Sequence, residues 1–423
     1  MKNPQHFYSK CDKCIATGCN HFDILQGKRC IGRSIKLYEG KCVMESKPYS
    51  KGLEGIVADE TRICKVDGIN GKLYYRGYSI EDLAAYSNYE EVCYLLLYEQ
   101  LPTTAELKDF SERMRQSRPL VQPVLDMIRS FPASAHPMEL LQSSVSYLSG
   151  YVKHRIEHSA TCNCRDTLYQ IAQLASVVAM YGRYREKREY VTPRMDLSHG
   201  ANFLYMLNGT EPDSREGEIM DKCLLIHAEH DFNASTFAAR VVASTLSTCY
   251  CSISSAIGAL YGSLHGGANQ RVIEMVDEIG DKNNVAAWME KAFAQKRKVM
   301  GMGHREYKAK DPRANIIQEF LMQLSEKKQD FRYYEILQEV EKVFRSKMET
   351  VGKPIYPNVD FYSGSVYRLL GIPAILFTPI FAMGRVAGWL AHILEQRSDN
   401  RIYRPESLWT GPEPRSYIHI EKR

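Results

Sequence analysis

Four short segments place histidine, arginine and aspartate beside glycine or proline, and these residue types could carry out acid–base chemistry. The first segment runs from Leu225 to Asp231 and contains His227 and His230. On a helix, two histidines three residues apart share a face with the spacing of metal ligands. No third ligand motif is nearby, and no Pro-Cys-x-x-Cys follows to complete a zinc-deaminase signature. We therefore predict no metal site here. The two histidines could have another function in the site, or they could simply belong to a polar helix face.

The second segment, Ser263–Asn269, has two glycines directly after His265. Glycine lets the backbone approach a ligand closely, and the apolar residues that follow predict the start of a helix. A histidine at a helix N-terminus is held neutral by the positive end of the dipole, so it can donate a hydrogen bond without being charged. A simple Gly-Gly turn is the alternative for this segment.

The third segment concentrates cations around a loop that contains Gly301 and Gly303. Its basic residues include Lys296, Arg297, Lys298, Lys308 and Arg313, and His304 follows the second glycine. Such a loop suits a phosphorylated ligand. A solvated charged face is the alternative, and the two glycines favour the loop.

The fourth segment, Tyr356–Gly364, places Asp360 among apolar and aromatic residues. Burial in such surroundings raises the pKa of a carboxyl group towards the range of a working general base. A structural aspartate that caps a helix is the alternative.

Taken together, HAEHDFNAS, LHGGAN, GMGHREYKAKDPR, PNVDFYSG and finally RPES resemble the citrate synthase family in order and spacing. The likeness begins at GLEGIVADET near Gly52 and extends to Gly411, so it covers most of the chain. The first fifty residues lie outside it. The resemblance implies a mainly helical homodimer that condenses acetyl-CoA with oxaloacetate and hydrolyses citryl-CoA to citrate.

The resemblance also assigns roles to individual residues. Asp360 would remove a proton from the thioester methyl group, His265 would stabilise the enolate oxygen, and His304 would protonate the ketone oxygen. The residues implied to hold the dicarboxylate are His230, Arg313, Arg385 and Arg404, the last of which enters the neighbouring subunit. The residues implied to meet the phosphates of coenzyme A are Lys296, Arg297, Lys298 and Lys308. Acetyl-CoA is then a co-substrate, and we expect no tightly bound cofactor.

Three other functions remain open. A 2-methylcitrate synthase would use propionyl-CoA with the same catalytic residues. A citryl-CoA lyase normally carries nucleotide-binding domains, which the sequence lacks. A non-catalytic scaffold is disfavoured because all three catalytic positions are filled.

The composition is that of an ordinary globular protein. The 423 residues are 44% hydrophobic and 25% charged, which excludes a disordered chain and allows a large core. The net charge is only +5, which argues against a dedicated nucleic-acid binder. The most apolar stretch, Leu369–Gly384, is too short to span a membrane and is broken by prolines. Because the first ten residues lack the apolar core of a secretory signal, we expect a cytoplasmic protein with reduced cysteines.

The elements that must position these residues are predicted to be mainly helices. Ser79 with Asp82 and Thr103 with Glu106 read as helix N-caps, and Pro137 suits a first helical turn. The small residues between Ser235 and Gly262 predict one tightly packed central helix, and Lys72–Arg76 a minor strand. We therefore predict an all-α fold, with a large domain of residues 51–267 and 371–423 and a small domain of residues 268–370.

Residues 1–50 form a cysteine-rich extension. Five of the 12 cysteines lie there, at Cys11, Cys14, Cys19, Cys30 and Cys42. Cys11 and Cys14, with Cys19, His21 and Cys30 available, could hold a structural zinc ion or an iron–sulfur cluster, but a single Cys-x-x-Cys pair is weak evidence. Unliganded thiols are slightly favoured.

Overall fold

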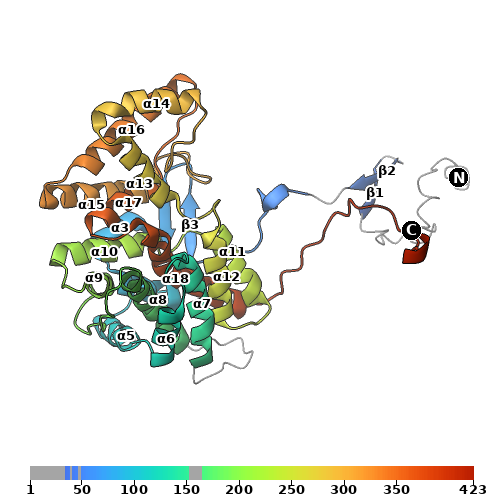
Figure 1. Cartoon of the computed structure of the whole chain (residues 1–423). Helices are drawn as coiled ribbons and strands as arrows, with labels where there is room; N and C mark the ends of the chain where they lie inside the picture. The colour runs from blue at the N-terminus through green and yellow to red at the C-terminus, as the bar shows by residue number, and fades with distance from the viewer. Residues whose placement is uncertain (1–33, 39–40, 46–48, 152–163) are drawn as a thin grey trace, which may run out of the picture. The chain divides into compact units, whose positions relative to one another are not determined.

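The computed structural model describes residues 34–38, 41–45, 49–151 and 164–423 (Figure 1). The chain divides into one unit of residues 1–60 and a second of residues 61–423. In the first unit, strands β1 (Ser34–Tyr38) and β2 (Lys41–Glu45) form an antiparallel pair in which Ser34 lies opposite Glu45. Four of the five N-terminal cysteines, and His21, lie outside the described residues. The predicted metal site therefore stays a hypothesis.

The second unit is mainly helical, as the sequence predicts. Its small antiparallel sheet has strands β3 (Cys64–Asp67), β4 (Lys72–Tyr75) and β5 (Tyr78–Ser79), so the short strand predicted at Lys72 is confirmed. Its α-helices are α3 (Ile80–Tyr86), α4 (Tyr89–Tyr98), α5 (Thr104–Gln116), α6 (Gln122–Ser130), α7 (Pro137–Leu148), α8 (Cys164–Arg185), α9 (His199–Asn208), α10 (Ser214–His227), α11 (Ala234–Ser244), α12 (Cys249–Tyr261), α13 (Ala268–Ile279), α14 (Val285–Ala294), α15 (Pro312–Lys328), α16 (Arg332–Thr350), α17 (Asp360–Leu369) and α18 (Phe377–Ser398). Short 3₁₀ turns are η2 (Lys51–Leu53, in the first unit), η3 (Ser149–Tyr151), η4 (Lys282–Asn284), η5 (Ala374–Leu376) and η6 (Ile420–Lys422). The division into a large and a small domain stays a prediction.

The helix starts predicted from polar residues are confirmed. The Ser79 side chain accepts a hydrogen bond from the backbone of Asp82, and Thr103 and Glu106 form a reciprocal capping box. Pro137 is the first residue of α7, where its missing N–H costs no hydrogen bond. These caps satisfy backbone donors that a helix N-terminus would otherwise leave unpaired.

The prediction of a single helix between Ser235 and Gly262 is wrong. The chain folds into α11 and α12, which pack against each other. It turns at Leu246, whose φ of +61° lies in the left-handed region, and the Thr248 side chain caps α12. The small side chains do permit close packing, but they do so between two helices.

The central helix is α18, which is buried along most of its length. With η5 it spans Ala374–Ser398, which is long and apolar enough to cross a membrane by length and composition alone. Because 83% of the apolar window is buried inside the protein, it matches the core helix of a globular fold. In the second unit, α18 contacts α4, α7, α8 and α10 to α13 (Figure 1).

Two glycines four residues apart on α18 allow α10 to approach closely. A Cβ atom on Gly384 would lie 2.9 Å from the carbonyl oxygen of Leu224, and one on Gly388 would lie 2.2 Å from that of Ala228. A side chain at either position would therefore push α10 away. Because Arg385 lies between the two glycines, this packing holds Arg385 against the C-terminal end of α10.

Candidate active site

The structure brings two of the predicted histidines together. His230 follows the end of α10 and His304 lies in the loop before α15, yet their ring centroids are 5.1 Å apart. The Nε2 atom of His230 lies 3.2 Å from the hydroxyl of Tyr307. Burial, with the nearby charge of Arg313, lowers the pKa of His230 well below its ordinary value. At neutral pH this ring is uncharged.

His227 and His230 do not share a helix face, because α10 ends at His227. The buried His227 ring donates through Nδ1 to the carbonyl oxygen of Cys223, 2.7 Å away. Burial lowers its pKa to about 3. Within the described residues, no group of three or more histidine, cysteine or acidic side chains could hold a metal ion.

The backbone fixes the tautomer of His304. Its Nδ1 atom accepts hydrogen bonds from the N–H groups of Glu306, at 3.0 Å, and Tyr307, at 3.3 Å. The ring proton of the neutral form therefore lies on Nε2. Burial and the charge of Arg313 lower the pKa of His304 to about 4. The loop thus presents a neutral N–H donor.

His265 presents a neutral donor in a different way. It lies two residues before Gly267, the N-cap of α13, but its Nε2 atom accepts a 3.2 Å hydrogen bond from the N–H of Ser235 in the first turn of α11. The helix start that acts on this ring is therefore that of α11, not the predicted start of α13. Burial lowers the pKa of His265 to about 4, and the ring proton lies on Nδ1.

Asp360 is the first residue of α17 but does not cap it. The N-cap is Val359, and the N–H of Asp360 donates to the side chain of Asn358 at 2.9 Å. Among the described residues, no group donates a hydrogen bond to the Asp360 carboxylate. Burial is the main reason that its pKa rises to about 6; Arg313 and Arg385 oppose the rise. This is the predicted state of a general base.

Two buried arginines accompany these groups. Arg313 pairs with Asp311 through Nε at 3.0 Å and Nη2 at 2.7 Å. Arg385 donates through Nε to the carbonyl oxygen of His227 at 2.7 Å, and its guanidinium lies 4.8 Å from the centre of the Phe381 ring. Nη1 of Arg313 and both Nη atoms of Arg385 bond to no other described residue. Each guanidinium therefore keeps donors for an anionic ligand.

Comparisons with known proteins show the family of this chain. The family model described as "Citrate synthase, C-terminal domain" matches residues 52–406. The chain belongs to the citrate synthase family.

Individual relatives of the family cover most of the chain. The citrate synthase of Synechocystis is 46% identical over 380 residues, which is 90% of this chain and 95% of the relative. The 2-methylcitrate synthase 1 of Corynebacterium glutamicum is 38% identical over 90% of this chain and 100% of its own length. A ternary complex of carboxymethyl coenzyme A and oxaloacetate with the citrate synthase of Thermoplasma acidophilum has a TM-score of 0.83, at 32% identity over 89% of this chain and 100% of that one. The all-α fold and the family expected from the sequence are confirmed.

Arg404 lies apart from the other predicted citrate synthase residues. It is exposed, in the segment after α18, and no contact among the described residues joins it to them. Its neighbour Tyr403 donates its N–H to the Ser244 side chain at 3.1 Å and packs on Phe237, with ring centroids 5.4 Å apart. The segment is therefore held against α11 in its own chain. The predicted entry of Arg404 into a neighbouring subunit stays a prediction.

The four predicted coenzyme A cations differ in their surroundings. Arg297 is paired with Glu278 at 2.7 and 2.5 Å and lies 4.9 Å from the centre of the Trp288 ring. Lys296 and Lys298 are exposed. Lys308 lines a cavity of about 340 Å³ that also contains His304. Of the four cations, Lys308 is thus the one that lines the cavity beside His304, and the binding of coenzyme A by the four stays a prediction.

Sequence reasoning missed two supporting residues of the site. Ser235 is buried and contacts His265 through both its N–H and its hydroxyl, and Trp389 donates to that hydroxyl at 3.2 Å. Asp311 pairs with Arg313 and also accepts from the N–H of Val359 at 3.2 Å. Both residues lie inside the motifs, but only the folded chain shows what they contact.

Proposed function

We propose that this member of the citrate synthase family condenses acetyl-CoA with oxaloacetate and hydrolyses the resulting citryl-CoA to citrate and coenzyme A. The observation that carries the proposal is a matched set of groups. Two partly buried histidines are neutral N–H donors, and a carboxylate with a raised pKa receives no hydrogen bond from the described residues. Relatives described as citrate synthases, at 40–46% identity, support the same reaction.

The protonation state of each group suits one step of the reaction. The Asp360 carboxylate removes a proton from the methyl carbon of the thioester. His265 donates from Nδ1 to the thioester oxygen as it gains negative charge, and because the ring is already neutral no charge has to be moved first. His304 donates its Nε2 proton to the ketone oxygen of oxaloacetate while the new carbon–carbon bond forms. Positioned groups of this kind each contribute about 10²- to 10⁴-fold to the rate.

Oxaloacetate carries two carboxylates, which suit guanidinium donors. Arg313 and Arg385 each keep free Nη donors, and His230 lies beside His304 as a further donor. Arg404 supplies a third arginine from the other subunit of a homodimer. Lys308 meets a phosphate of coenzyme A from the cavity beside His304.

The protein works in the cytoplasm, in a two-domain form that closes over oxaloacetate before the thioester reacts. Cys64, Cys93, Cys223, Cys249 and Cys251 are free thiols, which is compatible with a reducing compartment. Closure would exclude water until the carbon–carbon bond has formed.

The proposal must also decide which acyl-CoA is the preferred substrate. Relatives described as 2-methylcitrate synthases, at 38–40% identity, make propionyl-CoA the second candidate substrate. The test is to measure kcat/KM for acetyl-CoA and propionyl-CoA with saturating oxaloacetate, and to identify the product by mass. A clear preference for acetyl-CoA with citrate as product supports the proposal. A preference for propionyl-CoA would replace it with 2-methylcitrate synthesis, and no turnover with either would exclude both.

A further inference from the structure

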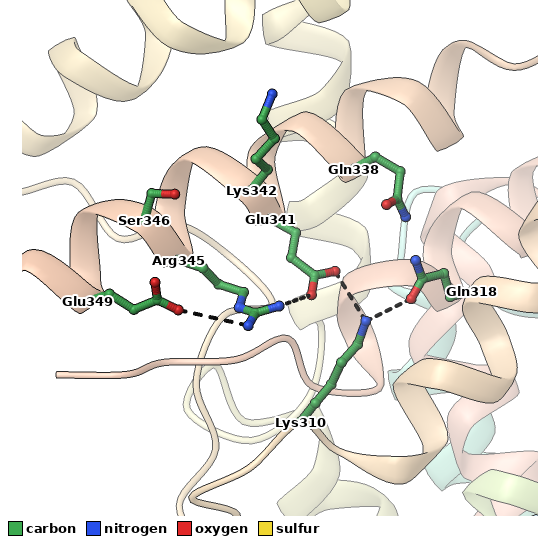
Figure 2. Close-up of a pocket in the computed structure, with 8 residues that line it drawn as sticks. All are labelled: Lys310, Gln318, Gln338, Glu341, Lys342, Arg345, Ser346 and Glu349. Atoms are coloured by element: carbon green, nitrogen blue, oxygen red, sulfur yellow. Dashed lines mark hydrogen bonds and ion pairs between the residues drawn. The ribbon is translucent and has the colours of Figure 1, made fainter.

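A chain of polar side chains links α16 to the two elements that carry the proposed acid and base. It runs along a cavity of about 340 Å³ between α16 and the loop before α15 (Figure 2). In Figure 2 the links follow one another from Glu349 through Arg345, Glu341 and Lys310 to Gln318. Acidic and basic groups alternate along this chain. The charged groups of this chain of side chains are therefore already paired with each other, and they need no ligand to balance their charges.

Glu341 is the centre of this chain. Its side chain is nearly buried, and it accepts hydrogen bonds from the Lys310 ammonium at 3.2 Å and from the Tyr362 hydroxyl. Arg345, on the same helix, approaches within 3.5 Å. The Lys310 ammonium also lies 5.4 Å from the centre of the Tyr362 ring. Burial strengthens such charge-assisted bonds, and it makes the loss of one partner costly.

The two partners of Glu341 lie on the two elements that carry the proposed acid, His304, and the proposed base, Asp360. Lys310 lies in the same loop as His304 and directly precedes Asp311. Tyr362 lies in the first turn of α17, two residues after Asp360. Glu341 is thus tied to both the loop of the acid and the helix of the base, although α16 itself contributes no proposed catalytic residue.

The two elements do not depend equally on this tie. Helix α17 also packs against α13 and α15, so its position is fixed by several contacts. The loop has no helical hydrogen bonds of its own. It is held by single hydrogen bonds to other segments, such as that of the Asn358 side chain to the carbonyl oxygen of Gly303 at 2.8 Å and that of the Lys308 N–H to the carbonyl oxygen of Gly68 at 2.7 Å. Loss of the Lys310–Glu341 pair should therefore displace the loop more than the helix.

We propose that Glu341 is a positioning residue, which holds the loop of His304 in register with the helix of Asp360. The proposal rests on the functions proposed above for His304 and Asp360. Glu341 touches no reacting atom, so it acts only through Lys310 and Tyr362. The expected result of breaking the link is a lower kcat for condensation without an equal loss of proton abstraction.

The test compares condensation with a partial reaction that does not need His304. The partial reaction is exchange of the methyl protons of acetyl-CoA with deuterium, with malate in place of oxaloacetate, because malate has no ketone to be attacked. The variants are Glu341→Gln, Lys310→Met and the double variant. Because the double variant leaves no unpaired charge in the buried site, it keeps the test valid if a single variant fails to fold.

If Glu341 is a positioning residue, all three variants should lose roughly tenfold in condensation kcat, while exchange stays within about twofold of the wild-type rate. The losses should be similar because all three variants remove the same ion pair between Lys310 and Glu341. The matched control is Glu349→Gln, which removes a carboxylate from the same cavity but breaks only a contact of 3.8 Å within α16. It should leave both rates unchanged.

Two results would overturn the proposal. One is a condensation kcat of the folded double variant within twofold of wild type. The other is an equal fall in exchange and condensation, which would indicate a general structural role. A wrong assignment of the base can be distinguished from a wrong assignment of Glu341. If Asp360 is the base, Asp360→Asn should abolish exchange in an otherwise unchanged protein. If it does not, the proposed base is wrong whatever Glu341 does.

Discussion

The backbone N–H of Ser235 donates a 3.2 Å hydrogen bond to Nε2 of His265. The first turn of α11 thereby sets which nitrogen of His265 carries the proton. His304 reaches a comparable state through the N–H of Glu306, which is 3.0 Å from its Nδ1 atom. Backbone donors cannot change protonation with pH, so both tautomers are fixed by the fold. Neither histidine should therefore titrate near neutral pH.

This arrangement predicts the pH dependence of catalysis. Asp360 must be ionised to act as a base, and its pKa is raised to about 6, so kcat should fall as the pH is lowered through about 6. His265 and His304, each with a pKa of about 4, stay neutral over that range, so they should cause no further change of kcat with pH. The measurement is kcat at saturating substrates from pH 5 to 8.5, together with histidine resonances followed by NMR. Either of these two rings titrating between pH 6 and 7 would contradict the prediction.

Asp360→Asn should abolish condensation and also stabilise the protein at neutral pH. The folded-state pKa of about 6 exceeds the ordinary 3.8, so the folded state favours the protonated carboxyl. Stability from this preference is complete below pH 4 and is lost as the pH rises through 6. Asparagine stays neutral, so the gain at pH 8 should be about 1–2 kcal/mol, reduced from the full shift because solvent reaches part of the side chain.

Urea unfolding of Asp360→Asn and wild type at pH 8 and pH 4.5 checks this prediction. The variant should be more stable at pH 8, with a smaller difference at pH 4.5. An equal difference at both pH values would mean that the charge is not responsible.

The close packing of α18 on α10 gives a third prediction. A Cβ atom at Gly388 would lie 2.2 Å from both the Ala228 carbonyl oxygen and the Glu229 carboxylate, so Gly388→Ala should destabilise the protein by about 2–4 kcal/mol. It should also raise KM for oxaloacetate, because Arg385 lies on the displaced surface. The control is Gly258→Ala in α12, where the added Cβ would meet only the flexible end of the Gln142 side chain. Urea unfolding and steady-state kinetics of both variants provide the check.

The cations predicted to bind coenzyme A should separate into two kinds. Lys308 lines the cavity beside His304, so Lys308→Met should raise KM for acetyl-CoA several-fold with little change in kcat. Arg297 is already paired with Glu278, so Arg297→Met should leave that KM nearly unchanged. KM measured at 20 and 200 mM salt should rise with salt in wild type and less so in Lys308→Met. If both substitutions raised KM for acetyl-CoA equally, the original prediction that all four cations bind coenzyme A would be favoured instead.

Much of the fold could be predicted because local signals and tertiary packing agree. The capping box at Thr103 and the start of α7 at Pro137 depend only on residues within one turn. The direction of the Asp360 pKa shift could be predicted because its sequence neighbours, such as Phe361, are buried and keep the carboxyl away from water. This loss of solvation outweighs the opposing charges of Arg313 and Arg385, which the sequence pattern does not show.

The remaining features depend on contacts that sequence spacing does not encode. The chain turns at Leu246 because α11 must fold back on α12, although the small residues there would also suit one long helix. The spacing of His227 and His230 suited a helix face, but α10 ends between them. The charge pattern of the third segment could not show that Arg297 pairs with Glu278, which is 19 residues earlier in the chain.

The last prediction concerns Arg404, which is exposed and joined to no other predicted site residue within its own chain. If it completes the site of the partner subunit, two inactive variants should rescue each other. Asp360→Ala subunits and Arg404→Ala subunits are mixed and allowed to exchange. Each mixed dimer then has one site with both defects and one site with neither. About half of randomly paired dimers are mixed, so roughly a quarter of all sites should regain activity. If Arg404 acts within its own chain, every site carries one defect, and no activity should return after exchange has been verified with tagged subunits.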